Sequence, residues 1–215
     1  LLAWMFVCGL APHLFAENLI EEFEGEAPSW RFFRNSSQAK ILRHDCSTDN
    51  PRSGQKSEMV VVETFPNDQP VELIYNLPPA VRFDELKASV WVWSDHPGIP
   101  AAVRVQLPKQ VDPRTGESRQ PLVFPVFGAI HGGGGQWQRL EIDLSDRAYK
   151  EALRRVRSDL ARRVGTNKLD EQGAFVDQIS LLLTTDQKVQ WTVCIDDLEL
   201  SPVITPQAGP TEEID

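Results

Sequence analysis

The residues with the clearest chemical use lie in two alternating segments, 86–93 and 101–107. Apolar residues occupy every second position in each segment, so the side chains between them share the opposite face. Aromatic rings pack against the apolar C–H faces of sugar rings, and planar donors bond to sugar hydroxyls. The segments therefore predict a ligand-binding face, and its candidate side chains are Trp91, Trp93, Arg104 and Gln106.

The tryptophan pair has a second interpretation, in which it is covered and forms a small core of its own. A hairpin around residues 107–127, or a helix around 146–164, could cover it. Exposure of the two rings in a shallow groove would favour ligand contact, and burial under either segment would favour the second core.

Signals of catalysis are weak in this sequence. His131 precedes four glycines, as in the oxyanion loop of lipases, but no G-x-S-x-G nucleophile motif occurs in the chain. The four histidines are scattered, and no H-E-x-x-H or C-x-x-C spacing is present, which argues against a zinc site. A carboxylate pair suited to glycoside hydrolysis is defined by separation in space, so the 31 acidic residues leave that alternative open.

Charge and length narrow the classes of protein further. The 215 residues carry 22 basic and 31 acidic side chains, for a formal net charge of −9. A nucleic-acid binder normally carries an excess of Lys and Arg to neutralise phosphates, so nucleic acid is not an expected partner. Six tryptophans against two tyrosines is a high share, and tryptophan serves binding surfaces as well as cores.

The two ends of the sequence differ from its middle. Residues 1–16 are almost entirely apolar but shorter than a membrane span of ~20 residues, so they are interpreted as a truncated signal peptide, with a membrane anchor or a buried helix as alternatives. Residues 204–215 have the composition of a linker or tail. We therefore expect an exported protein (secreted, periplasmic or on the cell surface) without stable membrane insertion. It would have one domain at 17–203 and a further domain downstream in the same chain.

The middle of the sequence consists of short runs rich in Val, Ile, Leu, Trp and Thr, separated by turn residues. Seven or more strands without alternating helices indicate an all-β antiparallel sandwich or barrel. The predicted strands cover 59–65, 71–77, 86–93, 101–107, 140–144, 179–184 and 189–200.

One amphipathic helix is predicted at about 146–164. Apolar residues recur at helical spacing, Ser145 or Asp146 supplies an N-cap, and Gly165 supplies a stop. Its polar face is basic: seven basic and three acidic residues give a net of +4, which leaves −13 for the rest of the chain. A solvated helix face is the ordinary interpretation, and a patch for an anionic polysaccharide or a partner is the functional one.

Three short segments resemble the galactose-binding-like jelly-roll superfamily, which includes carbohydrate-binding modules of secreted bacterial proteins. They are N-L-I-E-E-F-E-G at 18–25 followed by Ser29-Trp30, G-Q-W-Q-R-L at 135–140, and I-D-D-L-E-L at 195–200. The resemblance spans about 17–203 and implies an antiparallel jelly-roll β-sandwich, with the helix as an insertion. It does not choose a sugar.

The resemblance also implies a metal. In such modules the first and last strands lie together and often hold a structural Ca²⁺, which takes oxygen ligands, and Glu24, Asp196 and Asp197 lie where those carboxylates would be. Alternation with Val193 and Ile195 predicts that Asp197 points inward, where a carboxylate needs a cation or donors. Capping by backbone N–H groups or a salt bridge is the alternative.

Cys46 and Cys194 form an even pair once Cys8 is set aside with residues 1–16. A disulfide between them is one interpretation and two separate thiols are the other, because sequence spacing alone cannot bring two Cα atoms within ~7 Å.

Together these observations predict a noncatalytic glycan-binding module that targets an attached domain to a polysaccharide. A structural or adhesive module of the same fold, in contact with a partner protein, is the first alternative. A β-jelly-roll glycoside hydrolase or lyase is the second.

Overall fold

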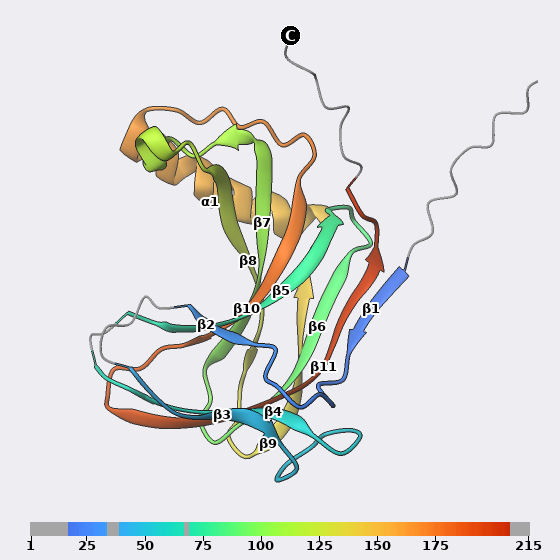
Figure 1. The fold of residues 1–215 in the computed structure, drawn as a ribbon. Coiled ribbons are helices and arrows are strands. Elements are labelled where there is room, and N and C mark those ends of the chain that lie inside the picture. Colours follow the sequence, from blue (N-terminus) through green and yellow to red (C-terminus); the bar gives the residue numbers. More distant parts are fainter. Residues whose placement is uncertain (1–16, 34–38, 67–68, 207–215) are drawn as a thin grey trace, which may run out of the picture.

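Residues 17–33, 39–66 and 69–206 are described by the computed structural model, and within them the chain forms two sheets and one α-helix (Figure 1). The predicted signal peptide and most of the predicted tail lie outside these residues. The helix is α1 (Asp146–Val164), and a short 3-10 helix covers Pro113–Ser118. The strands are β1 (Glu17–Glu21), β2 (Arg31–Phe33), β3 (Lys40–Ser47), β4 (Ser57–Thr64), β5 (Val71–Val81), β6 (Lys87–Ser94), β7 (Ile99–Val111), β8 (Pro121–His131), β9 (Gln136–Asp143), β10 (Phe175–Leu183) and β11 (Val189–Val203).

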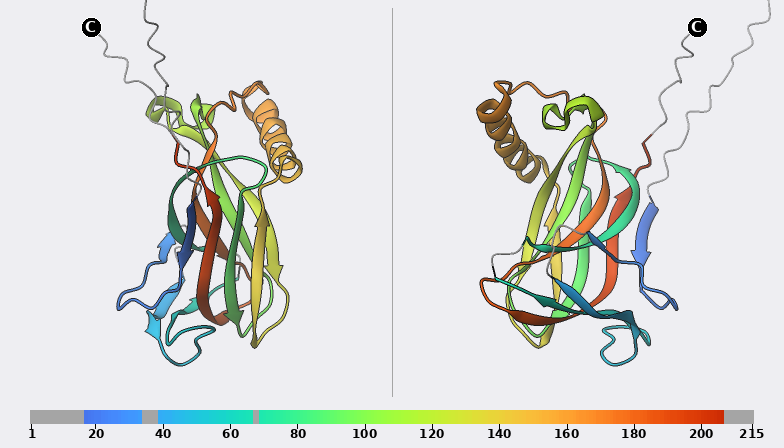
Figure 2. Two further views of the ribbon diagram at one scale, coloured as in Figure 1. Left: turned by 90° about the vertical axis from the view of Figure 1, so that its right-hand side faces the viewer. Right: turned by 60° about the vertical axis from the view of Figure 1, so that its left-hand side comes forward.

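The two sheets form the layers of a sandwich (Figure 2). The six-stranded sheet has the order β3-β4-β11-β6-β9, with β1 also paired to β11, and the five-stranded sheet has the order β2-β5-β10-β7-β8. Every strand pairing in the described part of the chain is antiparallel. The predicted all-β jelly-roll sandwich with one inserted helix is therefore confirmed.

The core lies between the sheets and follows the period of two that strands impose. Val90 and Val92 of β6, and Val103 and Val105 of β7, are completely buried in it. The alternate residues of the same strands face outward, so each sheet presents its own outer surface to solvent or to a ligand.

The β7–β8 hairpin extends past its sheet, and α1 covers the inner side of the extension (Figure 2). β10 pairs with β7 only as far as Gln106, whereas the hairpin continues until Val111 lies opposite Pro121. The rings of Phe124 on β8 and Tyr149 on α1 lie 6.0 Å apart. The helix thus replaces the second sheet as the covering layer here, and its buried residues are Tyr149, Leu153 and Leu160.

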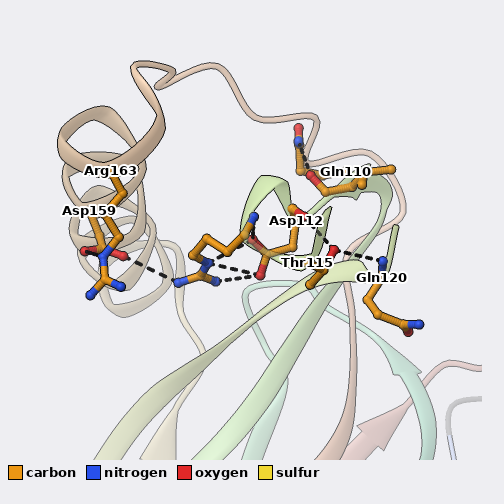
Figure 3. Close-up of polar contacts among 8 residues, drawn as sticks. Gln110, Asp112, Thr115, Gln120, Asp159 and Arg163 are labelled. Carbon is orange, nitrogen blue, oxygen red and sulfur yellow. Dashed lines mark hydrogen bonds and ion pairs between the residues drawn. The ribbon is translucent and has the colours of Figure 1, made fainter. Parts of the chain in front are cut away.

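Charged groups fasten the tip of this hairpin to the helix (Figure 3). The Asp112 carboxylate accepts hydrogen bonds from the backbone N–H of Arg114 at 2.9 Å and from its guanidinium at 2.8 Å. The Arg114 side chain, through these contacts, lowers the pKa of Asp112. The same guanidinium reaches Asp159 of α1 at 3.4 Å, and Asp159 also pairs with Arg163 at 2.8 Å. Hairpin tip and helix are therefore held together by charge as well as by the apolar contact.

A buried carboxylate holds the segment between β1 and β2 against β4. Glu58 is completely buried and lies opposite Ile195, on the inner side of its strand. It accepts from the backbone N–H groups of Ser29 at 2.7 Å and Trp30 at 3.0 Å, and it meets Nε2 of His44 at 2.7 Å. An inward-facing carboxylate is tolerable here because donors surround it.

The structure also extends the strand prediction. Pro78 and Pro79, expected to separate strands, lie inside β5. They are accommodated because β2 pairs with β5 only around residues 72–74, and the register with β10 shifts between residues 176 and 178. The strands β2 and β3 lie outside the predicted strands, whereas β1 lies in the segment where the resemblance implies a first strand next to the last one. β8 begins inside the predicted 107–127 hairpin and ends at His131. The helix prediction is confirmed, with Ser145 at the N-cap and Gly165 at the C-cap.

The first and last described strands lie side by side. Glu17 of β1 is opposite Val203 of β11. Among the described residues, no helix is both long and apolar enough to span a bilayer.

Candidate functional site

The four predicted ligand-binding side chains lie on two different sheets. Trp91 and Trp93 belong to β6 in the six-stranded sheet, whereas Arg104 and Gln106 belong to β7 in the five-stranded sheet. The turn between β6 and β7 crosses from one layer to the other, so the outward faces of these strands are on opposite sides of the sandwich. The prediction that these residues form one binding face is therefore wrong.

Arg104 has a partner of its own on the five-stranded sheet. Its guanidinium forms a two-pronged pair with the Asp177 carboxylate, with bonds of 2.8 and 2.7 Å. Beside it, the Gln178 side-chain amide donates to Asn76 at 3.3 Å. This outer surface therefore carries a row of polar groups that bond to one another.

A cluster of three tryptophans lies on the outer surface of the six-stranded sheet. Trp137 on β9 is directly opposite Trp93, in register, and Trp91 lies two residues along β6. All three side chains are partly buried and partly exposed. The 107–127 hairpin belongs to the other sheet, and α1 packs against β8, so neither covers the cluster as the second interpretation required.

One of the three rings is partly covered by a loop. The guanidinium carbon of Arg52 lies 3.8 Å from the centroid of Trp91, in a cation–π contact. Arg52 is fixed in turn by an ion pair with Asp197. In the described part of the chain no ring or cation stacks on Trp93 or Trp137 in this way, so these two rings form the open pair of the cluster.

A groove of about 1060 Å³ lies along β6 and β9 beyond the tryptophans, and none of the three tryptophans lines it. Arg139, opposite Trp91, is one of the residues that line it. Its guanidinium donates to the Ser89 hydroxyl at 3.0 and 3.1 Å and to Glu199 at 3.0 Å. Hydroxyl, carboxylate and guanidinium groups thus lie beside the aromatic surface, which is the combination a sugar requires.

The predicted metal ligands bind a loop instead. Glu24 accepts from the backbone N–H groups of Gln55 at 2.8 Å and Lys56 at 3.2 Å. Asp196 is completely buried and accepts from Arg52 N at 2.9 Å. Burial raises the pKa of Asp196, while its backbone hydrogen bonds oppose the rise.

The prediction that Asp197 points into the core is wrong. Its backbone has φ of 42°, in the left-handed region, and the β11–β6 register shifts between Asp196 and Glu199. This is a β-bulge, and one extra residue reverses the alternation beyond it. Asp197 is partly exposed and bonds to Arg52 and to the Ser53 hydroxyl.

The carboxylates therefore follow the capping alternative, in which N–H and hydroxyl groups meet them. Across the described residues, no group of three or more His, Cys, Asp or Glu side chains is placed to hold a metal ion. Calcium binding stays a prediction, to be checked in solution.

Cys46 and Cys194 are free thiols, so the disulfide interpretation is wrong. Cys46 lies opposite Glu58 of β4, and Cys194 lies opposite Met59. β4 separates the two cysteines, and neighbouring positions of a strand face opposite sides of the sheet. Burial raises the pKa of both thiols, that of Cys194 to about 11.

No protein-family model matches the sequence, and a search of curated proteins finds no match. Solved structures with a similar arrangement include carbohydrate-binding modules of the β-sandwich type. The family 11 module from Clostridium thermocellum, in complex with a β-1,3-1,4-mixed-linked tetrasaccharide, is 13% identical with a TM-score of 0.49, and the match covers 89% of this chain and 99% of that one. The CBM22-1 xylan-binding domain from Paenibacillus barcinonensis Xyn10C is 14% identical with a TM-score of 0.45, covering 89% and 97%.

A third solved structure concerns carbohydrate-binding modules from the β-sandwich superfamily, with 11% identity and a TM-score of 0.46. The match covers 83% of this chain and 60% of that one, so the chain spans less than two thirds of its length. At these identities and TM-scores, function has to be argued from the chain's own residues.

Proposed function

We propose that this domain is a noncatalytic module that binds polysaccharide on the outer surface of its six-stranded sheet. The observation that carries the proposal is the open pair Trp93 and Trp137, directly opposite each other on adjacent strands. The groove begins beside the third ring, because Arg139 lines it and lies opposite Trp91. Trp91, held under Arg52, extends the aromatic surface by a third ring.

The chemistry of each part suits a sugar polymer. The tryptophan rings offer flat apolar surfaces to the C–H faces of pyranose rings. Arg139, Ser89 and Glu199 are already linked by hydrogen bonds, so their positions are set before a ligand arrives, which reduces the entropy lost on binding. The site is an open face of a sheet, which suits the internal units of a polysaccharide chain better than a small ligand enclosed in a pocket.

A weak, pre-formed site of this kind acts by targeting. Tethering a catalytic domain near its polymer raises its local concentration, with no new contact needed between enzyme and substrate. We therefore propose that the module is part of an exported multidomain protein and brings an attached domain to its glycan.

A glycan array first surveys which sugars the protein binds. The test is then affinity electrophoresis of the protein through gels that contain xylan, mixed-linkage β-glucan or another glycan found on the array. Trp93→Ala and Trp137→Ala should each weaken binding by about 30-fold, the effect of losing ~2 kcal/mol from a central aromatic contact. Gln106→Ala on the opposite sheet is the matched control and should retain wild-type retardation.

Two outcomes contradict the proposal. Loss of retardation in Gln106→Ala, with both tryptophan variants unchanged, would move the site to the five-stranded sheet. An absence of retardation and of array binding by the folded wild type would favour the interaction-module alternative.

A further inference from the structure

The exposed side of α1 carries a stripe of arginines. Residues 147, 151, 154, 155, 158 and 162 are separated by three or four positions or are adjacent, so they share one face of the helix. All six are exposed. This basic stripe comprises Arg147, Glu151, Arg154, Arg155, Ser158 and Arg162, and it carries a net charge of +3 on a chain of −9.

Two of the four arginines in the basic stripe have no acidic partner among the described residues. Arg155 pairs with Glu151 at 2.5 Å, and Arg162 lies 3.6 Å from Asp159. Within residues 17–33, 39–66 and 69–206, no carboxylate lies within ion-pair distance of Arg147 or Arg154.

The charges on the other sides of the helix are used to anchor it. Arg157 pairs with Glu171 at 2.7 Å, and Asp146 pairs with Arg82 at 2.6 Å. Asp159 receives Arg114 from the tip of the hairpin (Figure 3). Together with the buried apolar face, these contacts fix the helix at its start, middle and inner side, so the basic stripe is presented on a rigid support.

The basic stripe is also hollowed. Five of its six members line a shallow depression of about 460 Å³ that runs from Glu151 to Arg162. These two residues are eleven positions apart, or ~17 Å at 1.5 Å per residue. That length suits a short stretch of an extended polymer better than a single small anion.

We propose that the basic stripe is a second binding site, for anionic polysaccharide, and that it is separate from the tryptophan face. Guanidinium groups form two-pronged, charge-assisted hydrogen bonds with sulfate and carboxylate groups. A flexible polyanionic strand can follow one helix face. A rigid duplex of nucleic acid would bring its phosphates close to the residues outside the helix, which together carry a net charge of −13. The resulting repulsion favours polysaccharide as the occupant.

The experiment compares dextran sulfate with uncharged dextran by affinity electrophoresis of the full chain, and adds polygalacturonate as a carboxylated polymer. The triple variant Arg154→Ala, Arg155→Ala and Arg162→Ala removes the charge without loss of helix propensity. The matched control, Lys109→Ala, Lys168→Ala and Lys188→Ala, removes three exposed positive charges away from the stripe.

The wild type should be retarded by one or both charged polymers and not by dextran, and the retardation should weaken as salt rises. The stripe variant should lose about tenfold or more in affinity, while the control stays within about threefold, as expected if charge position matters more than charge count. Preference for dextran sulfate or polygalacturonate tells which acidic group is recognised. Equal losses in both triple variants, no retardation of the wild type, or tighter binding to duplex DNA would each overturn the proposal.

The two proposed sites can fail separately. Trp93→Ala should keep its binding to the charged polymers, and the stripe variant should keep its retardation by neutral glucan.

Discussion

Replacing Glu58 by Gln tests whether this buried carboxylate organises the N-terminal segment. The carboxylate meets three donors: two backbone N–H groups, of Ser29 and Trp30, and Nε2 of His44. A Gln side chain has one acceptor oxygen and one NH₂ group, so with His44 protonated at Nε2 at least one of the three donors would face another donor. A buried donor left without a partner costs ~1–3 kcal/mol, and hydrogen bonds to a charged group are worth more than those to a neutral one.

We therefore expect Glu58→Gln to lower the free energy of unfolding by ~3 kcal/mol, which is about 6–12 °C in Tm for a domain of this size. Glu24→Gln is the matched control. Glu24 also accepts from two consecutive backbone N–H groups, but it is exposed, so water can replace the lost bonds and the cost should stay below ~1 kcal/mol.

The assay is equilibrium unfolding in urea, with the slope m checked for each variant. A Glu58→Gln protein within ~1 kcal/mol of wild type, or no less stable than Glu24→Gln, would refute the argument that buried donors need this charge. A change in m without a change in midpoint would instead place the effect in the unfolded state.

Three further predictions follow from named groups. The side chains of Lys150 and then Arg82 lower the pKa of Asp146 to about 2. Because the ordinary carboxyl pKa is higher, Asp146 adds stability above about pH 4 that is lost as pH falls towards 2. A plot of Tm against pH should therefore be flatter in this range for Asp146→Asn than for the wild type. An unchanged slope would refute the stabilising role of Asp146. Cys46 and Cys194 should resist iodoacetamide at pH 8 in the native protein and react after unfolding in the absence of reductant, since burial raises the pKa of both; a pair that stays unreactive after unfolding until reduced would show a disulfide. If calcium is bound, EDTA should lower Tm and added Ca²⁺ should restore it, whereas an unchanged Tm counts against the metal.

Local pattern was enough for much of the fold. The alternation in residues 86–93 correctly separates buried Val90 and Val92 from the outward tryptophans. The helical spacing from Tyr149 onward gives a helix with the predicted bounds. In both cases a single element sets the period of the buried positions, so the local sequence is enough to predict which residues are buried.

Pattern failed where the answer depended on pairing between distant strands. Alternation shows which residues of one strand share a face, but it does not show that β6 and β7 belong to different sheets. For this reason, alternation alone wrongly places Arg104 and Gln106 on one binding face with Trp91 and Trp93. The partner that the structure supplies instead, Trp137, carries a usable signal, because residues 137, 139 and 141 alternate with the buried Leu140 and Ile142.

The carboxylates near the end of β11 show a second limit. A single extra residue in the strand, at the bulge beside Asp197, reverses which side chain is buried. The sequence shows two adjacent aspartates and gives no sign that the loop at residues 52–53 will bond to both, to Asp196 through backbone N–H groups and to Asp197 through side chains.

The covering of the hairpin by α1 has a consequence for shortening or redesigning the domain. The β7–β8 hairpin and the helix are separated in the sequence by β9, yet each is the apolar partner of the other. Deleting the helix alone would uncover the inner side of the hairpin, and trimming the hairpin alone would remove the strand against which α1 packs. Any viable deletion must remove both together, so the two segments are a single accessory unit encoded in two places, and the plain sandwich beneath them is the part that remains.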